Sequence, residues 1–436
     1  MAAFRTILII IFIAAFIVAV LVFANVIKVG DQKTSTVSGA VTIWGPFPRQ
    51  SVQTFIDELN IENTDLRIKY EQKSPQALDT DLIEAIASGT QPDLVIFSDK
   101  TFLRYRDKLT VAPYTSYPER LYRDTYVDGA SVFLTTDGVQ LFPLLVDPLV
   151  VYYNKDILAK ARYITPPTTW EGLNASIPLL LRKDVRGAIV QSPIALGETL
   201  NINHFKDIVA AMLLQTGSPI VTFDKDTNTY VAAVEGSVNG SVSQELSPQA
   251  QAVSYYTSFS NATNALYSWN KSQTGSLDTF LSGKSGFYIG RASELFTIQS
   301  RNPNLNFDVT QLFQPSDPTR PISYGEFYGI GVLKSSKNFS AAYSTALQFA
   351  DKPFVDYLSK QLSLPPVRRD LLLAATPNAY LSVFFNAAAN AFAWPDPNDN
   401  GTDTVFGDMI RKVNSGELTS GDAIYEASKT LQSFIR

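Results

Sequence analysis

Three charged side chains border or interrupt apolar stretches of the chain, where an ion is costly to bury unless it is paired or hydrogen-bonded. Asp147 interrupts the long apolar run 142–151, while Asp99 and Arg291 each come at the end of a shorter apolar segment. Carboxylates and a guanidinium in such positions can bind the polar groups of a ligand or hold neighbouring backbone. We therefore take Asp147, Asp99 and Arg291 as the first candidates for a functional site.

The sequence lacks most of the residue types that several common catalytic and metal-binding sites require. His204 is the only histidine and there is no cysteine, which removes histidine-based metal sites, thiolate chemistry and Ser-His-Asp catalysis. The sequence 283–285 (GKS) ends like a phosphate-binding loop, but Asp278 occupies the upstream glycine position. The segment 396–401 matches half of a calcium loop, whose twelfth position is Gly407 instead of Glu. No metal or cofactor is expected.

The length of 436 residues is enough for two or three domains with full cores. The net charge is −5 and there is no basic run, which argues against nucleic acid as a partner. The absence of cysteine fits an exported protein that avoids free thiols.

The amino terminus carries an apolar run, Ile7–Ile27, that is interrupted only by Asn25. A helix of this length spans a hydrocarbon core of about 30 Å. A cleaved signal peptide usually has a shorter core, so we favour an uncleaved anchor, although 22–24 (VFA) offers a cleavage site. Residues 1–29 are predicted to be this anchor or signal segment and 30–39 a linker, with the rest of the chain outside the membrane.

Strands and helices alternate after the linker, as the spacing of apolar residues indicates. Strand, helix, strand, helix, strand is the pattern of a parallel sheet with right-handed crossovers, and ligands gather at the carboxyl ends of such strands. The five elements are expected at 40–44, 52–59, 66–70, 76–88 and 92–97. A further buried strand is expected at 149–153, after the proline-punctuated apolar run 142–148.

A series of motifs, in a fixed order, carries a resemblance to a known family. They are AIASGTQPDLV, DGVQLFPLLVD, LVVYYNKDIL, PPTTWEGL, FLSGKSGFYIG, GVLKSSKN and LPPVRRD. Together they resemble the extracellular solute-binding proteins of ABC importers, specifically the carbohydrate-binding group that includes maltose-binding protein. The likeness covers nearly all of the chain after the linker.

The resemblance implies a two-lobed α/β fold, periplasmic-binding-protein-like (type II), to which the apolar run at the amino terminus adds a transmembrane helix. The lobes close on the ligand by hinge motion. Residues 40–147 and 326–364 are expected to form the N-terminal lobe, and 148–325 and 365–436 the C-terminal lobe. The hinge is predicted at three crossing segments, with Leu145, Val146, Pro148, Tyr324, Phe327 and Pro365 as its residues.

The same resemblance implies a carbohydrate ligand, which aromatic faces and planar polar groups would hold. Trp44, which precedes Gly45-Pro46, and Trp394, which precedes Pro395, are the predicted platforms. The polar contacts are predicted from Asp99, Asp147, Arg291 and Glu326.

Each of these residues also has a structural interpretation. Both tryptophans can be core residues, and Asp99 can cap the helix that follows it. Asp147 can hold backbone N–H groups at the hinge, and Arg291 can form a salt bridge between the lobes without a ligand. Glu326 can serve hinge packing.

The expected function is that of a non-enzymatic, monomeric receptor that delivers a small solute to the permease subunits of an ABC importer. Two alternatives remain at this stage. One is a surface glycosidase with Asp147 and Glu326 as paired carboxylates, and the other is a receptor-like fold used for sensing or adhesion.

Overall fold

The computed structural model describes residues 38–224, 227, 229–235, 247–374 and 378–435. No helix within these ranges is both long and apolar enough to cross a membrane. The predicted anchor, Ile7–Ile27, lies outside the described residues.

One curled sheet of ten strands runs through the molecule in the order β2-β1-β3-β13-β6-β11-β8-β7. β12 also pairs with β6, and β14 with β13. The strands are β1 (Gly39–Gly45), β2 (Leu66–Gln72), β3 (Leu94–Ser98), β6 (Phe142–Asn154), β7 (Arg182–Lys183), β8 (Ile189–Ile194), β11 (Ser285–Arg291), β12 (Phe307–Gln311), β13 (Ser323–Val332) and β14 (Ala391–Phe392). Two small hairpins are formed by β4 (Ala112–Pro113) with β5 (Gly138–Val139), and by β9 (Val221–Asp224) with β10 (Thr229–Ala232).

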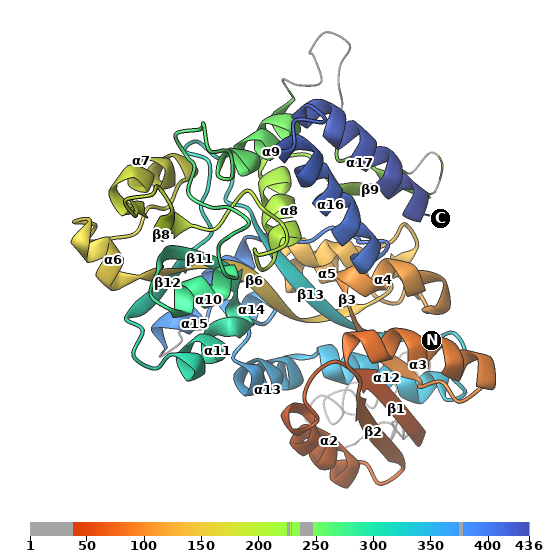
Figure 1. The fold of residues 1–436 in the computed structure, drawn as a ribbon. Helices are drawn as coiled ribbons and strands as arrows, with labels where there is room; N and C mark the ends of the chain where they lie inside the picture. The colour runs from red at the N-terminus through yellow and green to blue at the C-terminus, as the bar shows by residue number, and fades with distance from the viewer. Residues whose placement is uncertain (1–37, 225–226, 228, 236–246, 375–377, 436) are drawn as a thin grey trace, which may run out of the picture.

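The helices pack on this sheet in two groups (Figure 1). The N-terminal lobe consists of β1–β3 with α2 (Gln50–Glu62), α3 (Pro75–Ser88), α4 (Asp99–Tyr105), α5 (Glu119–Thr125), α12 (Phe339–Ala350) and α13 (Lys352–Leu362). The C-terminal lobe contains β7–β12 with α6 (Lys155–Lys160), α7 (Trp170–Leu180), α8 (Phe205–Gln215), α9 (Pro248–Ser258), α10 (Ser276–Leu281), α11 (Leu295–Arg301), α16 (Asp399–Asn414) and α17 (Ser420–Phe434). α14 (Arg369–Leu372) and α15 (Ala379–Ala389) follow the last crossing between the lobes.

The predicted alternation of strand and helix at the start of the body is confirmed. β1 pairs in parallel with both β2 and β3. α3 ends at Gly89, whose φ of 71° is a left-handed conformation that favours glycine after a helix.

β6 differs from the expectation because the apolar run and the strand after it form one strand of 13 residues. Its first part, Phe142–Pro148, pairs with β13, and Leu149–Tyr153 pairs with β11. Pro148 is the last residue paired with β13, so its missing N–H falls where β6 changes partners. One strand therefore belongs to both lobes.

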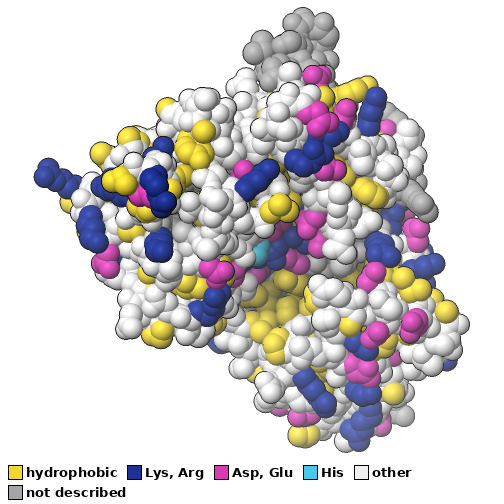
Figure 2. Space-filling view, in the orientation of Figure 1, with side chains coloured by type: hydrophobic (Ala, Val, Ile, Leu, Met, Phe, Trp, Pro, Cys, Tyr) yellow, Lys and Arg dark blue, Asp and Glu magenta, His cyan; other side chains and the backbone are white. Residues whose placement is uncertain are grey.

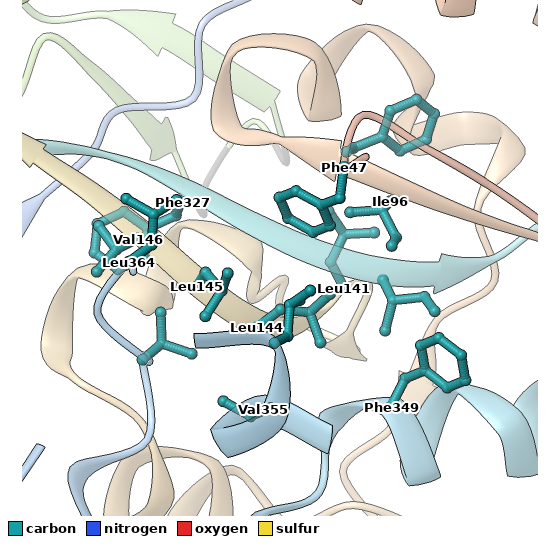
Figure 3. Close-up of a cluster of buried hydrophobic side chains, with 14 of the residues drawn as sticks. Phe47, Ile96, Leu141, Leu144, Leu145, Val146, Phe327, Phe349, Val355 and Leu364 are labelled. Atoms are coloured by element: carbon teal, nitrogen blue, oxygen red, sulfur yellow. The ribbon is translucent and has the colours of Figure 1, made fainter. Parts of the chain in front are cut away.

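The predicted hinge residues lie in three segments that run side by side. Glu326 is opposite Asp147 in the pairing of β13 with β6. The third segment follows α13, where Val146 N donates to Pro365 O (3.1 Å) and Val367 N donates to Leu144 O (3.2 Å). Figure 3 shows Val146, Phe327 and Leu364 where the segments meet.

Two clusters of buried apolar side chains form the core, and all their members lie between Val41 and Leu431. The first fills the N-terminal lobe but continues past the hinge, since it includes Tyr152, Phe307 and Phe384. The second fills the C-terminal lobe. The predicted lobe boundaries stay a prediction, and the first core extends beyond them.

Candidate ligand-binding site

Arg291 lies at the centre of a buried network of charges at the junction of the lobes. It ends β11, and its two terminal nitrogens reach different elements: Nη1 contacts Glu326 of β13, and Nη2 donates to Asp207 of α8 at 2.5 Å. Burial alone would lower the pKa of Arg291, but these two carboxylates raise it well above its ordinary value. The third nitrogen, Nε, is buried without a hydrogen-bond partner among the described residues.

Lys100 links the two lobes across this network. It lies on α4 of the N-terminal lobe, and its Nζ is 2.8 Å from Oδ1 of Asp207 and 3.7 Å from Oδ1 of Asp399, both in the C-terminal lobe. Burial would raise the pKa of Asp207, but Lys100 and Arg291 outweigh it and hold that pKa well below its ordinary value. Asp207 is therefore ionised and shared between a cation of each lobe.

His204 and Glu294 extend the network on the C-terminal side. Nε2 of His204 lies 3.2 Å from Oε2 of Glu294. Glu294 also accepts from Arg291 N (3.0 Å) and from Tyr288 Oη (2.9 Å). Burial would raise the pKa of Glu294, but His204 and these donors lower it.

The carboxylate of Asp147 accepts hydrogen bonds from the C-terminal lobe, one of them from the backbone. Its Oδ1 accepts from Ser293 N (3.0 Å) and its Oδ2 from Ser293 Oγ (2.6 Å). These bonds agree with the interpretation of Asp147 as a hinge carboxylate that holds a backbone N–H, and its contact with a ligand stays a prediction. Burial raises its pKa.

Asp99 is fully buried and holds the second crossing strand. Its Oδ1 accepts from Phe327 N (2.7 Å) and its Oδ2 from Tyr324 Oη (3.2 Å). Burial, and then the charge of Glu326, raise the pKa of Asp99 well above its ordinary value. Neither helix capping nor contact with the cleft accounts for this geometry, because the partners belong to β13.

The half calcium loop at 396–401 is filled by a lysine of the chain itself. Nζ of Lys206, a buried residue on α8, lies within 3.0 Å of five oxygens. These are Asp396 Oδ2 (3.0 Å), Asp399 O (2.9 Å), Asp399 Oδ1 (2.5 Å), Thr402 Oγ1 (3.0 Å) and Asp403 Oδ1 (2.9 Å). The loop thus has its cation within the protein, and no cluster suited to a metal ion occurs among the described residues.

A hollow opens between the lobes beside the charge network. Figure 2 shows apolar side chains on its floor and the single histidine, which is His204, at its edge among acidic and basic side chains. Tyr328 comes two residues after Glu326 on β13 and so lies on the same face of the strand; it is partly exposed, and its ring centroid is 5.3 Å from that of Phe47. This places an aromatic ring next to planar polar groups at the junction.

The structure does not bring the two predicted tryptophan platforms to the network. Trp44 is 8% exposed, and Nζ of Lys73 lies over its ring, 4.2 Å from the centroid. Trp394 is 2% exposed and stacks on Phe406 in the core of the C-terminal lobe. Trp394 thus takes the alternative position, and contact of Trp44 with a ligand stays a prediction that requires Lys73 to move.

Sequence reasoning brought together Asp99, Asp147, Arg291 and Glu326 but missed their partners. Lys100, Asp207 and Ser293 supply the contacts that hold the network. Asp207 occupies the first turn of α8, the position at which acidic residues are common in helices. Only the burial of Asp207 beside Lys100 and Arg291 distinguishes it from an ordinary acidic residue at the start of a helix, and the sequence does not show that burial.

Two α/β lobes that share strands β6 and β13, with a charged cleft at their junction, define the architecture of a hinged binding protein. The model of the bacterial extracellular solute-binding proteins matches residues 54–384, and the chain belongs to this family. None of the curated proteins compared with the chain matches it significantly.

Solved structures of similar fold cover nearly the whole body. The cyclic α-maltosyl-1,6-maltose binding protein of Arthrobacter globiformis has a TM-score of 0.72 at 20% identity, covering 91% of this chain and 99% of that one. The sugar-binding protein MalE of Xanthomonas citri has a TM-score of 0.70 at 16% identity, covering 91% and 97%. The GacH receptor of Streptomyces glaucescens, solved with acarbose, has a TM-score of 0.66 at 16% identity, covering 91% and 98%.

Proposed function

We propose that this protein binds a sugar or oligosaccharide between its lobes and delivers it to an ABC importer. The observation that carries the proposal is the charge network of Lys100, Asp207, Arg291 and Glu326, which joins both lobes and the hinge at one edge of the cleft. A solute bound there would contact both lobes at once. Closure would then remove water from the site and order the lobes around the ligand.

The chemistry of the cleft suits a polyhydroxylated ligand. Tyr328 offers a ring face, and the charged groups offer planar donors and acceptors for hydroxyls. A surface cavity of about 840 Å³ lies against α9 and α16 instead, and no aromatic side chain lines it. That cavity lacks the surface needed to cover the apolar face of a sugar. The three proteins of similar fold described above are named as sugar-binding or were solved with acarbose, which supports the proposal.

The glycosidase alternative requires two free carboxylates at Asp147 and Glu326. Both oxygens of Asp147 accept from Ser293, and Glu326 is bonded to Arg291. Burial would raise the pKa of Glu326, but Arg291 and Lys100 lower it, which disfavours a proton-donating acid. The geometry therefore favours binding over hydrolysis.

Membrane attachment and the importer partner complete the proposal. The family is extracellular, so the folded body lies outside the cytoplasm. We propose that residues 1–29 hold it at the membrane as a single-pass anchor, that the body is monomeric, and that it docks on the permease subunits. Proteinase treatment of intact cells should release the body while a tag placed before Arg5 stays protected; release of intact full-length protein into the medium would contradict the anchor.

The test of sugar binding is a thermal-shift panel of linear and cyclic gluco- and manno-oligosaccharides with product analysis after long incubation. A true ligand at a hundredfold excess over its Kd should raise the free energy of unfolding by about 2.7 kcal/mol. Stabilisation without new products supports a receptor, and release of shorter sugars would overturn that function. Amino acids and peptides in the same panel identify a different solute class, which would leave the binding fold intact but refute the carbohydrate.

A further inference from the structure

One end of the C-terminal lobe carries an unusual concentration of basic and aliphatic side chains. It is formed by α6, α7 and the β7–β8 hairpin, which meet around Gly286, where Ile157, Leu180 and Pro193 approach one another. We call this the α6–α7–hairpin end. Figure 2 shows Lys and Arg side chains gathered there with apolar side chains among them. It lies outside the cleft and has no part in solute binding as proposed above.

Two aliphatic side chains project fully into solvent at this end. Ile164, in the connection from α6 to α7, is 99% exposed, and Val185, in the β7–β8 turn, is 104% exposed. Leu179 and Val190 behind them are about half exposed. Single exposed aliphatic residues are ordinary, but four of them among basic side chains at one end of a lobe offer apolar groups that can enter an apolar phase.

The charges around these tips are unbalanced. Residues 155–190 hold six Lys and Arg and three Asp and Glu, a net charge of +3 in a chain of net charge −5. The cations are Lys155, Lys160, Arg162, Arg182, Lys183 and Arg186. Of these, only Arg186 forms an ion pair with a described carboxylate, that of Asp184 at 3.5 Å.

The acidic residue of the hairpin tip is turned inward. Oδ1 of Asp184 accepts from Arg186 N (2.8 Å) and Ala188 N (2.9 Å), and Gly187 takes the left-handed φ of 81° that closes the turn. The carboxylate is thus used to build the turn. Val185 and the basic side chains are left on the outside of the tip.

We propose that the α6–α7–hairpin end contacts the surface of an anionic phospholipid bilayer. Cations would attract the anionic headgroups while Ile164 and Val185 insert among the acyl chains, the two contributions on which interfacial binding depends. The tips are convex, which suits a fluid surface better than a shaped pocket on a protein. Such contact would orient the cleft relative to the membrane. It requires the body to be extracytoplasmic but does not depend on the solute.

Vesicle flotation of residues 38–436 tests the electrostatic part, because both cores lie entirely within this fragment. The fragment should float with vesicles of phosphatidylcholine and phosphatidylglycerol, but not with phosphatidylcholine alone, and added salt should weaken binding. Reversal of Arg182, Lys183 and Arg186 to Glu should weaken it about a hundredfold, at roughly fivefold for each basic residue near the surface. The matched control reverses Lys108, Lys334 and Lys337, three exposed lysines of the N-terminal lobe, with the same change in net charge.

Single-cysteine labelling tests the insertion, since the chain has no cysteine of its own. An environment-sensitive dye at Ile164→Cys or Val185→Cys should shift to shorter emission wavelength with anionic vesicles. The same dye at Ile61→Cys, 77% exposed on α2, should not.

Three outcomes would overturn the proposal. These are failure of the fragment to float with anionic vesicles, equal loss of binding in both triple variants, and unchanged emission of the dyes at positions 164 and 185. Binding that requires the importer's membrane subunits and not the anionic lipid would assign this end to a protein partner and would also refute it. Loss of solute binding in the panel above leaves all of these readouts unaffected, so the two proposals fail separately.

Discussion

Two adjacent residues of α8, Lys206 and Asp207, belong to two different buried charge clusters, and the clusters differ in which lobe supplies the partners. Lys206 is held by five oxygens, all of them from the same lobe. Asp207, the next residue, contacts Arg291 of its own lobe and Lys100 of the other. Arg291 in turn leaves its Nε without a partner among the described residues. The oxygens that hold Lys206 all come from its own lobe, and the other lobe reaches one of them, Asp399 Oδ1, only at 3.7 Å through Lys100. The contacts of Asp207, in contrast, depend on the position of the second lobe.

This difference suggests a structural role for the Lys206 cation and a functional role for Arg291. A buried ion whose hydrogen-bonding capacity is fully used gains nothing from a ligand, whereas one with an unused donor can still bind. The Lys206 cluster therefore fixes the first turn of α8, and we propose that the Arg291 cluster responds to closure and to the solute. The following predictions test this division, from the largest expected effect to the smallest.

Lys206→Met should lower the free energy of unfolding by about 3–5 kcal/mol, because it leaves buried Asp396 and its neighbours without a cation. Urea unfolding measures the change. Lys429→Met, at a fully exposed position on α17 of the same lobe, is the control and should be nearly neutral. A loss of less than 1 kcal/mol in Lys206→Met would show that the cluster is not structural.

Arg291→Met should cost less stability, about 2–3 kcal/mol, because Lys100 still faces Asp207 after the change. Affinity for a sugar found in the thermal-shift panel should fall along with it, measured by calorimetry at a temperature where the variant is folded. Arg291→Lys keeps the charge but cannot reach Glu326 and Asp207 together, so it should restore stability better than affinity. Unchanged affinity in Arg291→Met would remove the functional role.

Lys100→Met should cost about 1–2 kcal/mol of stability, because Arg291 still faces Asp207 after the change. It should also shift the lobes apart, because it removes the ion pair between them. Small-angle scattering of the unliganded protein should show a larger radius of gyration. Lys73→Met breaks an ion pair with Asp81 inside the N-terminal lobe and is the matched control, for which the radius should stay the same. Equal radii for Lys100→Met and wild type would mean that this pair does not hold the lobes.

Glu294→Gln should change the pH dependence of stability. The folded state lowers the pKa of Glu294 below its ordinary value of 4.5, so its ionised form stabilises the fold above that pH, and this stabilisation is lost as pH falls toward the lowered pKa. The variant should be about 1 kcal/mol less stable at neutral pH, and the difference should shrink below about pH 4.5. Glu119→Gln, in an exposed pair on α5, should show no such pH-dependent difference. A constant difference across the titration would refute the assignment.

The local elements could be predicted from sequence because each depends on neighbouring residues. The apolar spacing of 76–88 and the glycine after it defined α3 without knowledge of the fold. The same holds for the strands β1 to β3. β6 was predicted too short because Pro148 normally ends a strand, and only its change of partners makes it acceptable there.

The site was predicted in part, for a physical reason. An isolated charge in an apolar run signals that a partner must exist, which identified Asp147 and Arg291. It carries no information about which partner, since Lys100 and Asp207 are 107 residues apart in sequence and meet only through tertiary packing. Trp394 had the same local pattern for cleft and core, and its stacking on Phe406 of α16 decides between them.

The antiparallel pairing of β13 with β3 sets the order in which this chain can fold. Residue Tyr328 is opposite Ser98, so the first sheet stays open at β3 until residues 323–332 have been synthesised. The N-terminal lobe therefore cannot complete itself early as an independent unit, and its long-range closure makes folding slow. A chain with this topology remains unfolded through most of its synthesis, which is the state in which a polypeptide can be threaded across a membrane before it folds.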